Sequence, residues 1–505
     1  MSYIIKQKIK GTTYVYEVNA YWDKEKKQAR QKRVCLGKKD DMTGETIPSK
    51  ASAPLKTCKD YGNYHFLDYI SGKIGLKEIL KAQFPEQWED ILTCAYYEIS
   101  ERKPLYLCEQ WSESTVTPAN GVLASQRISE LLKSLGENDN ERMKFFKAWG
   151  KYRAEREYLA FDITSISSYS KMLEMLEFGY NRDGEDLPQI NMGMLFGETS
   201  MLPIFYNLYQ GSIKDVTTLS NMLKYTDHLN ITKVRYVMDK GFYSEKNINA
   251  MLEKRIGFTI AVPFTAGYAK DLVDSAKESI GSPANSFMIN DDIIQFSSKL
   301  VSKKGKRLYT FVYYNERKYI DEKEALIKKI ILLEQELING SKNIDNGGEC
   351  LKYLVVRKSK KGLIINRNED KIKESLRYKG YLVIISNDKN KPQEILRIYR
   401  AKDSIEKAFD NFKNELDSKR LRVHSDNAMK GRVFIGFISL ILHSWIDGKM
   451  KEEGLYKKYT QEEVMYELKK LKIVEFTKRK RILTEISKNQ QLLFKAFKVP
   501  LPVAT

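Results

Sequence analysis

The chain has 505 residues, with 86 Lys or Arg against 66 Asp or Glu and a formal net charge of +20 at pH 7. This length exceeds the roughly 250 to 300 residues that a single hydrophobic core supports, and the 42% hydrophobic and 11% aromatic residues exclude a disordered tail. The positive excess indicates a polyanionic partner, for which nucleic acid is favoured over an anionic membrane.

Residues 1–57 predict a basic β-hairpin region. The runs TYVYEVNAYW and KRVCLG alternate apolar and polar residues, and the basic segment DKEKKQAR joins them. A cationic tip of this kind fits a phosphate contact and a solubilising surface loop about equally well. The first ten residues carry lysines inside their only apolar stretch, so no secretory signal is predicted and we expect the protein to stay in the cytoplasm.

Residues 58–155 predict several short helices, in segments such as WEDILTCAYYEIS and NERMKFFKAWGKY. We interpret this region as a helical DNA-binding domain, although helical bundles serve many other purposes. No recognition helix can be named within it.

Residues 156–263 predict the first part of an α/β core in which strands deliver carboxylates to one edge of a sheet. One apolar run ends in Asp162 and is followed by hydroxyl and turn residues, and the run VRYVM ends in Asp239, after which Gly241 allows a sharp turn. Strands that alternate with helices and carry acids at their ends are typical of an α/β sheet with a site along that edge. A lone aspartate at a strand end is more often a turn or cap residue, so neither residue alone indicates a metal site.

Two further apolar runs, INMGMLFG and MLPIFYNLYQG, separate these aspartates and are expected to be neighbouring antiparallel strands. Gly211 and Asp215 follow them in a loop that borders the same edge. We assign both residues structural roles.

Residues 264–388 predict a separate β-rich insertion, because runs such as IIQFSS, LYTFVYY and YLVIIS alternate around a charged helix. The core is expected to resume over residues 389–447. Its last segment, Val433–Ile446, is apolar nearly all round, which is typical of a buried helix. It is interrupted by His443 and Ser444 and is shorter than the roughly 20 residues that a membrane span needs, so no membrane helix is predicted.

Residues 448–505 predict a basic, helical C-terminal tail that is rich in lysine. The run KRKR at 478–481 is suited to a phosphate backbone, although a solvated charge run is the commoner explanation.

The segment Ile398–Leu416 predicts one helix that carries a third carboxylate. At about 3.6 residues per turn, charged and aromatic side chains spaced by three, four and seven residues share one face, and these are Tyr399, Lys402, Glu406 and Lys413. An adjacent apolar stripe is expected to pack on a core, and it comprises Ile405, Phe409, Phe412 and Leu416. An amphipathic helix with a solvated charged face explains this segment, taken alone, about as well.

Residues other than carboxylates offer little for catalysis. The cysteines are odd in number and include no CxxC pair, and they are Cys35, Cys58, Cys94, Cys108 and Cys350. The four histidines are scattered along the chain. Neither a zinc site nor a Ser/His/Asp hydrolase is therefore indicated, and an enzyme built on this chain would have to use carboxylates.

Tyr399, Lys402, Glu406 and Lys413 resemble the Tyr-(2)-Arg-(3)-Glu-(6)-Lys signature of bacterial insertion-sequence transposases of the DDE type, in the IS-four-like group. The segments YLAFDITSI and MDKGFYS resemble the first and second aspartate motifs of that family, and the resemblance runs from about residue 156 to residue 447. One position departs from the signature, because Lys402 stands where the family has arginine. Lysine keeps the charge but lacks the planar fork that makes two parallel hydrogen bonds.

The resemblance implies a fold of the α/β class: a ribonuclease-H-like core with a β-rich insertion before the glutamate helix, an N-terminal β-hairpin and a helical DNA-binding region. It implies that Asp162, Asp239 and Glu406 are catalytic and bind two divalent cations, Mg²⁺ or alternatively Mn²⁺. It further implies that Tyr399, Lys402 and Lys413 contact DNA. Three carboxylates suit such hard cations, since phosphate and water complete the coordination.

The implied activity is metal-dependent strand cleavage and strand transfer at the terminal inverted repeats of an insertion sequence, in the cytoplasm of a bacterium at the nucleoid. The implied partners are double-stranded DNA with these repeats and target DNA, and because two ends must be held together we expect a homodimer on DNA. Two alternatives remain: a non-catalytic DNA-binding protein derived from a transposase, and another ribonuclease-H-like nuclease. The insertion and the flanking domains disfavour the second alternative.

Overall fold

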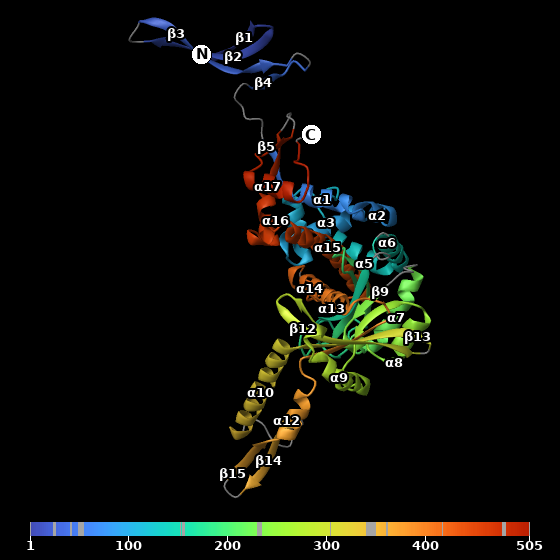
Figure 1. Ribbon diagram of the computed structural model, residues 1–505. Coiled ribbons are helices and arrows are strands. Elements are labelled where there is room, and N and C mark those ends of the chain that lie inside the picture. The colour runs from blue at the N-terminus through green and yellow to red at the C-terminus, as the bar shows by residue number, and fades with distance from the viewer. Residues whose placement is uncertain are drawn as a thin grey trace. The chain divides into compact units, whose positions relative to one another are not determined.

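The computed structural model in Figure 1 describes residues 2–503, apart from 24–26, 41–42, 49–54, 152, 154–156, 230–234, 304, 340–349, 360–361, 417 and 477–480. The fold is mixed α/β, and the chain divides into two compact units. One comprises Met1–Phe66, Ser112–Thr117 and Glu462–Thr505, and the other comprises Leu67–Trp111 and Pro118–Gln461.

The first unit begins with a four-stranded antiparallel sheet in the order β1-β2-β3-β4. Its strands are β1 (Ser2–Ile9), β2 (Thr12–Asp23), β3 (Gln28–Lys39) and β4 (Thr46–Pro48). The two runs that predicted a hairpin are β2 and β3, which pair antiparallel, and β1 and β4 add an edge strand on each side. The cationic tip between β2 and β3 lies partly outside the described residues.

A second sheet in this unit combines one strand from the N-terminal part of the chain with two from the C-terminal part. Its strands are β5 (Leu55–Asp60), β17 (Lys472–Phe476) and β18 (Ile482–Leu483), in the order β18-β17-β5. The helix α17 (Lys488–Ala496) follows, with a capping box at its start. The C-terminal tail is therefore not wholly helical as predicted, because β17 pairs antiparallel with β5. Most of the KRKR run lies outside the described residues.

The second unit contains helices packed around the long helix α15 (Asp426–Glu452). They include α2 (Leu76–Gln83), α3 (Trp88–Glu101), α5 (Ser125–Glu137) and α6 (Asp139–Lys151). Two more helices, α1 (Gly62–Lys73) and α4 (Cys108–Ser114), each have residues in both units. Glu98 of α3 forms a buried ion pair with Arg432 of α15 and accepts a hydrogen bond of 2.7 Å from Ser439. Helices thus occur where the sequence predicts them, and their DNA-binding role stays a prediction.

Among the described helices, α15 has the length and the apolar composition to cross a membrane, but 83% of its most apolar window is buried inside the protein. Its residues Gly431 and Gly436 lie so close to neighbouring elements that a Cβ would stand 2.0 Å from the carbonyl oxygen of Leu132 and 2.7 Å from the ring of Phe412. Close packing of this kind is typical of a core helix, as the sequence predicts.

A nine-stranded sheet in the order β11-β12-β13-β16-β10-β9-β6-β7-β8 forms the centre of the second unit. Neighbours in this sheet pair antiparallel except β6 with β9 and β9 with β10, which are parallel. The first strands are β6 (Tyr158–Ser167), β7 (Gln189–Gly197), β8 (Pro203–Gln210), β9 (Arg235–Met238) and β10 (Gly257–Ala261), with helices α7 (Asp215–His228) and α8 (Glu245–Glu253) between them.

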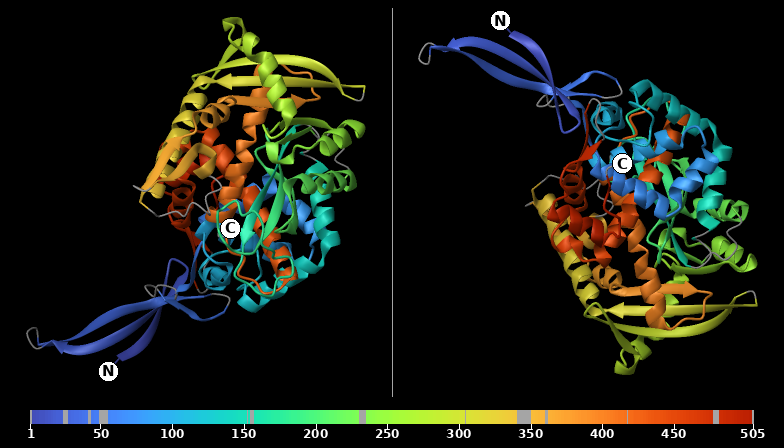
Figure 2. Two further views of the ribbon diagram at one scale, coloured as in Figure 1. Left: turned by 90° about the horizontal axis from the view of Figure 1, so that it is seen from below. Right: turned by 90° about the horizontal axis from the view of Figure 1, so that it is seen from above.

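The predicted separation of residues 264–388 is wrong for most of their strands. After α9 (Gly267–Ile280), the strands β11 (Ser286–Ile289), β12 (Asp292–Lys303), β13 (Lys306–Asn315) and β16 (Tyr381–Ser386) extend the central sheet, because β16 pairs with β10. Figure 2 shows the long hairpin of β12 and β13 in yellow. Alternation of apolar and polar residues identifies a strand but not its neighbour in a sheet, so the sequence alone did not place these strands.

The rest of that segment packs on itself outside the sheet. It comprises α10 (Glu316–Ile338), α11 (Cys350–Tyr353), β14 (Leu354–Ser359), β15 (Gly362–Arg367) and α12 (Glu369–Leu376). Leu326, Ile330 and Leu333 of α10 pack in one cluster with Tyr353 and Leu354. This part of the segment has β14 and β15 as its own two-stranded sheet, but it contains more helix than strand, whereas a β-rich insertion was predicted.

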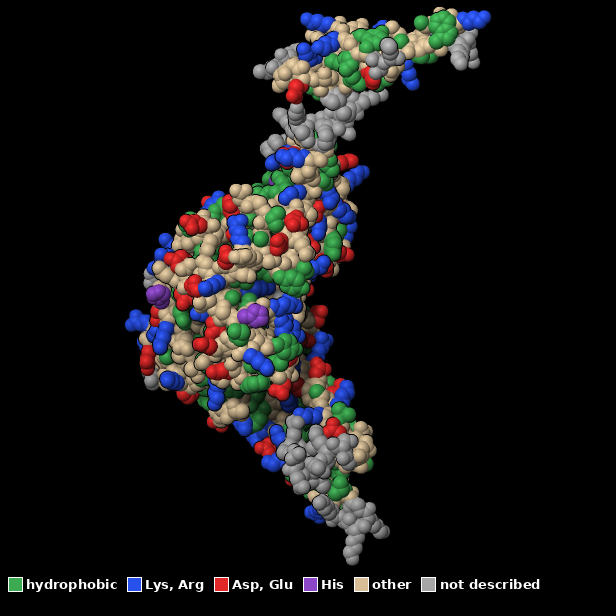
Figure 3. All heavy atoms as spheres, turned by 180° about the vertical axis from the view of Figure 1, so that it is seen from behind, with side chains coloured by type: hydrophobic (Ala, Val, Ile, Leu, Met, Phe, Trp, Pro, Cys, Tyr) green, Lys and Arg blue, Asp and Glu red, His purple; other side chains and the backbone are tan. Residues whose placement is uncertain are grey.

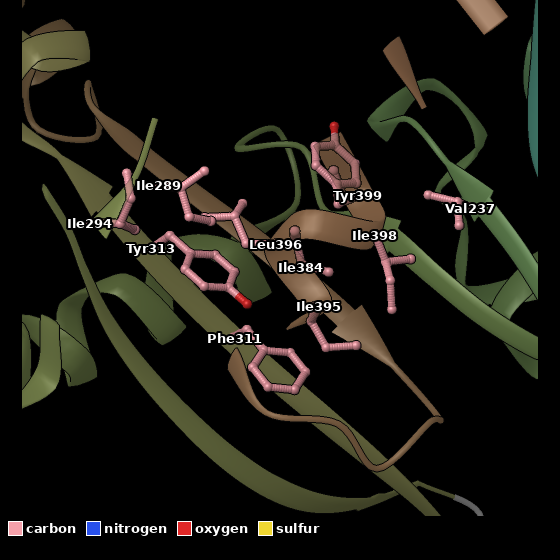
Figure 4. Close-up of a cluster of buried hydrophobic side chains, with 11 residues drawn as sticks. Val237, Ile289, Ile294, Phe311, Tyr313, Ile384, Ile395, Leu396, Ile398 and Tyr399 are labelled. Atoms are coloured by element: carbon pink, nitrogen blue, oxygen red, sulfur yellow. The ribbon is translucent and has the colours of Figure 1, made fainter. Parts of the chain in front are cut away.

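The helix α13 (Pro392–Ala401) is held on the sheet by a buried cluster that Figure 4 shows. Ile395, Leu396 and Ile398 of this helix pack against strand residues such as Phe311 and Ile384. Figure 4 shows the hydroxyl of Tyr399, in the last turn of α13, directed away from this cluster.

The surface in Figure 3 mixes Lys and Arg with Asp and Glu, so on this face the positive excess is not gathered into one patch.

Candidate active site

Asp162 and Asp239 each come directly after the last paired residue of two neighbouring parallel strands. The pairing of β6 with β9 ends at Phe161 and Met238, which are partners in the register, so the next residue on each strand is an aspartate. Neighbouring strands lie about 4.8 Å apart, which brings the two backbones together at this point. Asp239 also leaves β9 directly and precedes a 3₁₀ turn, Lys240–Phe242.

The prediction that Asp162 ends its strand is wrong, because β6 continues to Ser167. Beyond Asp162, β6 is no longer paired with β9, but it stays paired with β7 as far as Ser167, whose partner is Gln189. The hydroxyl residues that suggested a turn, such as Ser165, are buried and hydrogen-bonded instead. The candidate site therefore lies where the sheet splits and not at the end of β6.

The predicted single helix Ile398–Leu416 is divided. Helix α13 ends at Ala401, α14 (Asp403–Asp410) follows after Lys402, and a π-helical turn covers Asn411–Glu415. Helix α13 packs against β9 and β10, and α14 packs against β6 and β7. The two helices thus cross the strands that carry both aspartates.

Three residues of the predicted signature form hydrogen bonds at the candidate site: Tyr399 with Asp239, and Lys402 with Glu406. The hydroxyl of Tyr399 donates a hydrogen bond of 2.7 Å to Oδ1 of Asp239. The ammonium of Lys402 lies 2.7 Å from Oε1 of Glu406. Burial and the nearby carboxylate of Asp239 raise the pKa of Tyr399 well above its usual range, so this phenol stays protonated and remains a donor.

Lys402 lies within electrostatic reach of all three predicted catalytic acids. Burial alone would lower the pKa of its ammonium, but the hydrogen bond to Glu406 and the charges of the two aspartates raise it above its ordinary value. Its side chain is 13% exposed, whereas that of Glu406 is 56% exposed. Lys402 therefore offsets part of the negative charge of the three acids.

Burial raises the pKa of Asp162 from 3.8 to about 7. A hydrogen bond from the backbone at Ile163 and the charges of Lys402 and Arg182 act in the opposite direction, and the charge of Glu406 adds to the rise. Asp162 is thus a desolvated carboxyl group whose charge nearby cations only partly balance.

Among the residues that the structure describes, no group of three or more His, Cys, Asp or Glu side chains is placed to hold a metal ion. The predicted convergence of Asp162, Asp239 and Glu406 within one metal site is thus not confirmed: in this structure Tyr399 is hydrogen-bonded to Asp239, and Lys402 to Glu406. The donor set nevertheless fits hard divalent cations, because it offers carboxylate oxygens.

Lys413, which we predicted to share a face with Glu406 and to contact DNA, is paired in this structure with an acid outside the predicted triad. The π-helical turn that contains it changes the spacing, and its ammonium lies 2.8 Å from both carboxylate oxygens of Asp183 in the loop between β6 and β7. Lys413 is buried, and this desolvation lowers the pKa of its ammonium despite the partner.

Arg182 is a residue that the sequence analysis did not select. It comes from the same loop, its guanidinium donates to Ser165 at 3.3 Å, and it pairs with Asp215. Asp215 lies against the turn after Asp239, since a Cβ on Gly241 would stand 3.2 Å from its carboxylate. The segment NRDGED around Arg182 has the composition of an ordinary turn, so no pattern distinguished it.

Gly211, which we assigned a structural role, fills a position that only glycine fits. A Cβ there would stand 2.2 Å from the carbonyl oxygen of Glu177 and 2.3 Å from that of Gln189. The residue thus allows the loop between β6 and β7 to pack on the edge of the sheet.

A comparison with known protein families matches the part of the chain that contains the candidate site. Residues 154–442 match the family described as "Transposase DDE domain". No curated protein matches the chain. Among solved structures, a similar one is that of the piggyBac transposase synaptic complex with hairpin DNA, at 10% identity and a TM-score of 0.36, over 80% of this chain and 70% of that one.

Proposed function

This chain belongs to the family of transposases with a DDE domain, and we propose on that premise that it is an active DNA transposase. It would cleave and transfer strands at the terminal inverted repeats of an insertion sequence by a cut-and-paste route, in the bacterial cytoplasm at the nucleoid. The five strands in the order β8-β7-β6-β9-β10 would be the core strands of a ribonuclease-H-like fold.

Asp162, Asp239 and Glu406 would hold two divalent cations, Mg²⁺ or Mn²⁺. When bound, such a pair activates the attacking water or 3′-hydroxyl and stabilises the leaving oxygen. The observation that carries the proposal is the register that ends with Asp162 beside Asp239, together with a lysine, Lys402, that interacts with both and with Glu406. Strongly perturbed pKa values cluster at functional sites, and the pKa of Asp162 is raised from 3.8 to about 7.

Lys402 would act as a stand-in for cations in the free protein. Its ammonium holds Glu406 at 2.7 Å and offsets the negative charge at the site until metal and DNA bind. Released from Glu406, the same ammonium would contact a phosphate near the scissile bond. As a lysine it would make this contact as a point charge and without the fork of arginine.

Tyr399 and Lys413 would be the other DNA contacts. The Tyr399 hydroxyl orients Asp239 in the free protein, and we propose that it lies beside the DNA backbone in the complex. Lys413 would first have to leave Asp183, to which it donates in this structure. Its contribution to DNA binding therefore includes the energy of breaking that ion pair.

The partners would be double-stranded DNA with inverted repeats and target DNA. Two protomers would pair on DNA, because joining two ends of one element needs both to be held. Light scattering with and without end-containing DNA tests this point, and a single protomer for each pair of ends would refute it.

The proposal is tested by incubating the protein with DNA that carries the ends of its own element and their flanking sequence. We expect strand breaks at the element boundary that need Mg²⁺ or Mn²⁺ and are lost with Asp239→Asn or Glu406→Gln, while DNA binding remains. Binding of the ends without cleavage by the unaltered protein would favour a non-catalytic DNA-binding protein. Cleavage without regard to the ends would favour a general nuclease.

A further inference from the structure

The loop between β6 and β7, residues 168–188, exposes aromatic side chains that the proposed function does not use. Tyr169 is 72% exposed, Phe178 is 67% exposed and Tyr180 is 81% exposed. Several large apolar groups exposed on one short segment often mark a binding surface. We call these three residues the aromatic loop surface.

The backbone that carries this surface is fixed. The carbonyl oxygen of Tyr180 accepts hydrogen bonds from Gln189 at 2.9 Å and from Ser165 at 3.4 Å. Glu177 and Gln189 also exchange two backbone hydrogen bonds, of 3.1 and 3.0 Å. The rings are thus presented from an ordered loop, which lowers the entropy that a partner must remove on binding.

Guanidinium groups lie beside two of the rings. Cζ of Arg182 lies 5.9 Å from the centre of the Tyr180 ring, and Cζ of Arg420 lies 5.4 Å from that of Tyr169. Two of the five acids in the loop are paired with cations, Asp183 with Lys413 and Glu185 with Arg420. Aromatic rings interleaved with arginine on a strongly basic protein suit a partner that combines negative charge with flat rings.

The aromatic loop surface also lies near the candidate active site. Ser165, which binds the carbonyl of Tyr180, is on the same strand as Asp162 and three residues after it, a distance of about 10 Å along a strand. Arg182, beside Tyr180, is close enough for its charge to act on Asp162.

We propose that the aromatic loop surface stacks on unpaired bases of the DNA strand that is processed at the candidate active site. This inference rests on the proposed function and names the state of the DNA that the site receives: an end whose bases are locally separated. Every base offers a flat face, so such stacking tolerates any sequence. Recognition of paired DNA through phosphates would not need exposed rings.

The test uses two oligonucleotide duplexes of equal length, one fully paired and one with a short unpaired end that contains 2-aminopurine. Binding is measured by anisotropy and stacking by quenching of 2-aminopurine, both without divalent metal. We expect Tyr180→Ala and Tyr180→Leu to weaken binding of the unpaired end about tenfold or more and to abolish quenching. Tyr180→Trp should retain both, and binding of the paired duplex should not change. Tyr169→Ala should act in the same direction as Tyr180→Ala.

Tyr466→Ala is the matched control, because Tyr466 is a tyrosine of α16 (Gln461–Lys469) that is 63% exposed. It should leave both duplexes unaffected. Equal loss of affinity for the two duplexes with Tyr180→Ala, or normal binding of the unpaired end by Tyr180→Leu, would overturn the proposal. So would a loss of self-association with Tyr180→Ala at unchanged DNA affinity, since the surface would then bind a second copy. Failure of the unaltered protein to cleave DNA would refute the proposed function, but the binding comparison needs no cleavage.

Discussion

The carboxyl group of Asp162 is expected to destabilise the metal-free protein at neutral pH, and Asp162→Asn tests this. Its pKa is about 7 in the folded protein and 3.8 as a free side chain. Between these values the folded state keeps a proton that the unfolded state releases, so stability falls as the pH rises through this window. Asparagine does not titrate, and the variant should therefore be the more stable protein above about pH 7.

The size of the effect follows from the difference between the two pKa values. Each pH unit corresponds to about 1.4 kcal/mol, so a shift from 3.8 to about 7 has an upper limit of about 4 kcal/mol. Asp162 keeps some contact with solvent, which screens its charge, and we expect roughly 2 kcal/mol. For a unit of this size that is a rise in melting temperature of roughly 3 °C.

The assay is thermal unfolding at pH 4 and pH 8, with EDTA and with excess Mg²⁺. With EDTA, the melting temperature of Asp162→Asn should be higher than that of the unaltered protein at pH 8 and equal to it at pH 4. Mg²⁺ should stabilise the unaltered protein at pH 8 and have a smaller effect on the variant, because a ligand is lost.

Glu198→Gln provides the control. Burial raises the pKa of Glu198 to about 8, with a contribution from Glu157, and this residue follows β7 near the start of β6. Its replacement should also raise stability at pH 8 but leave the response to Mg²⁺ unchanged. A lower melting temperature for Asp162→Asn at pH 8, or the same difference between the two proteins at both pH values, would show that ionisation of Asp162 does not destabilise the folded protein.

Further predictions concern packing and charge. Gly211→Ala should destabilise the protein by about 2 kcal/mol or more, because its Cβ would stand 2.2 Å from a loop carbonyl oxygen. Gly448→Ala, inside α15 with nothing within 4 Å of the added Cβ, should stabilise the protein by about 0.5 kcal/mol. Thermal unfolding of the two variants tests this difference. Lys413→Met leaves the carboxylate of Asp183 without its 2.8 Å partner and should destabilise by about 2 kcal/mol, and adding Asp183→Asn should recover part of this loss. Lys402→Ala should slow cleavage and reduce the salt dependence of DNA binding by about one phosphate contact, and an unchanged rate with an unchanged slope would leave Lys402 without a role at DNA.

Spacing along the sequence identified the residues of the candidate site better than it described their geometry. Asp239 follows its strand as predicted, since an apolar run that stops at an acid and a glycine has few other conformations. Asp162 does not end its strand, because its following hydroxyl residues find buried partners across the sheet. Such partners come from distant segments, which a local pattern does not include.

The glutamate helix shows the limit of periodicity. A uniform 3.6-residue period placed Lys402, Glu406 and Lys413 on one face, and the first two do interact. Lys413 follows in a π-helical turn and pairs with Asp183. Packing of Phe412 against α15 accompanies this turn, and tertiary contacts of that kind override the local period.

We propose that Asp162, Asp239 and Glu406 hold divalent cations beside DNA. The most direct test of this proposal is a crystal structure of the protein with end-containing DNA and Mn²⁺, in which anomalous scattering locates the metal. We expect anomalous peaks within coordination distance of all three carboxylates, with Lys402 moved from Glu406 to a phosphate. Mn²⁺ bound elsewhere, with Lys402 still paired to Glu406 beside the DNA, would contradict it.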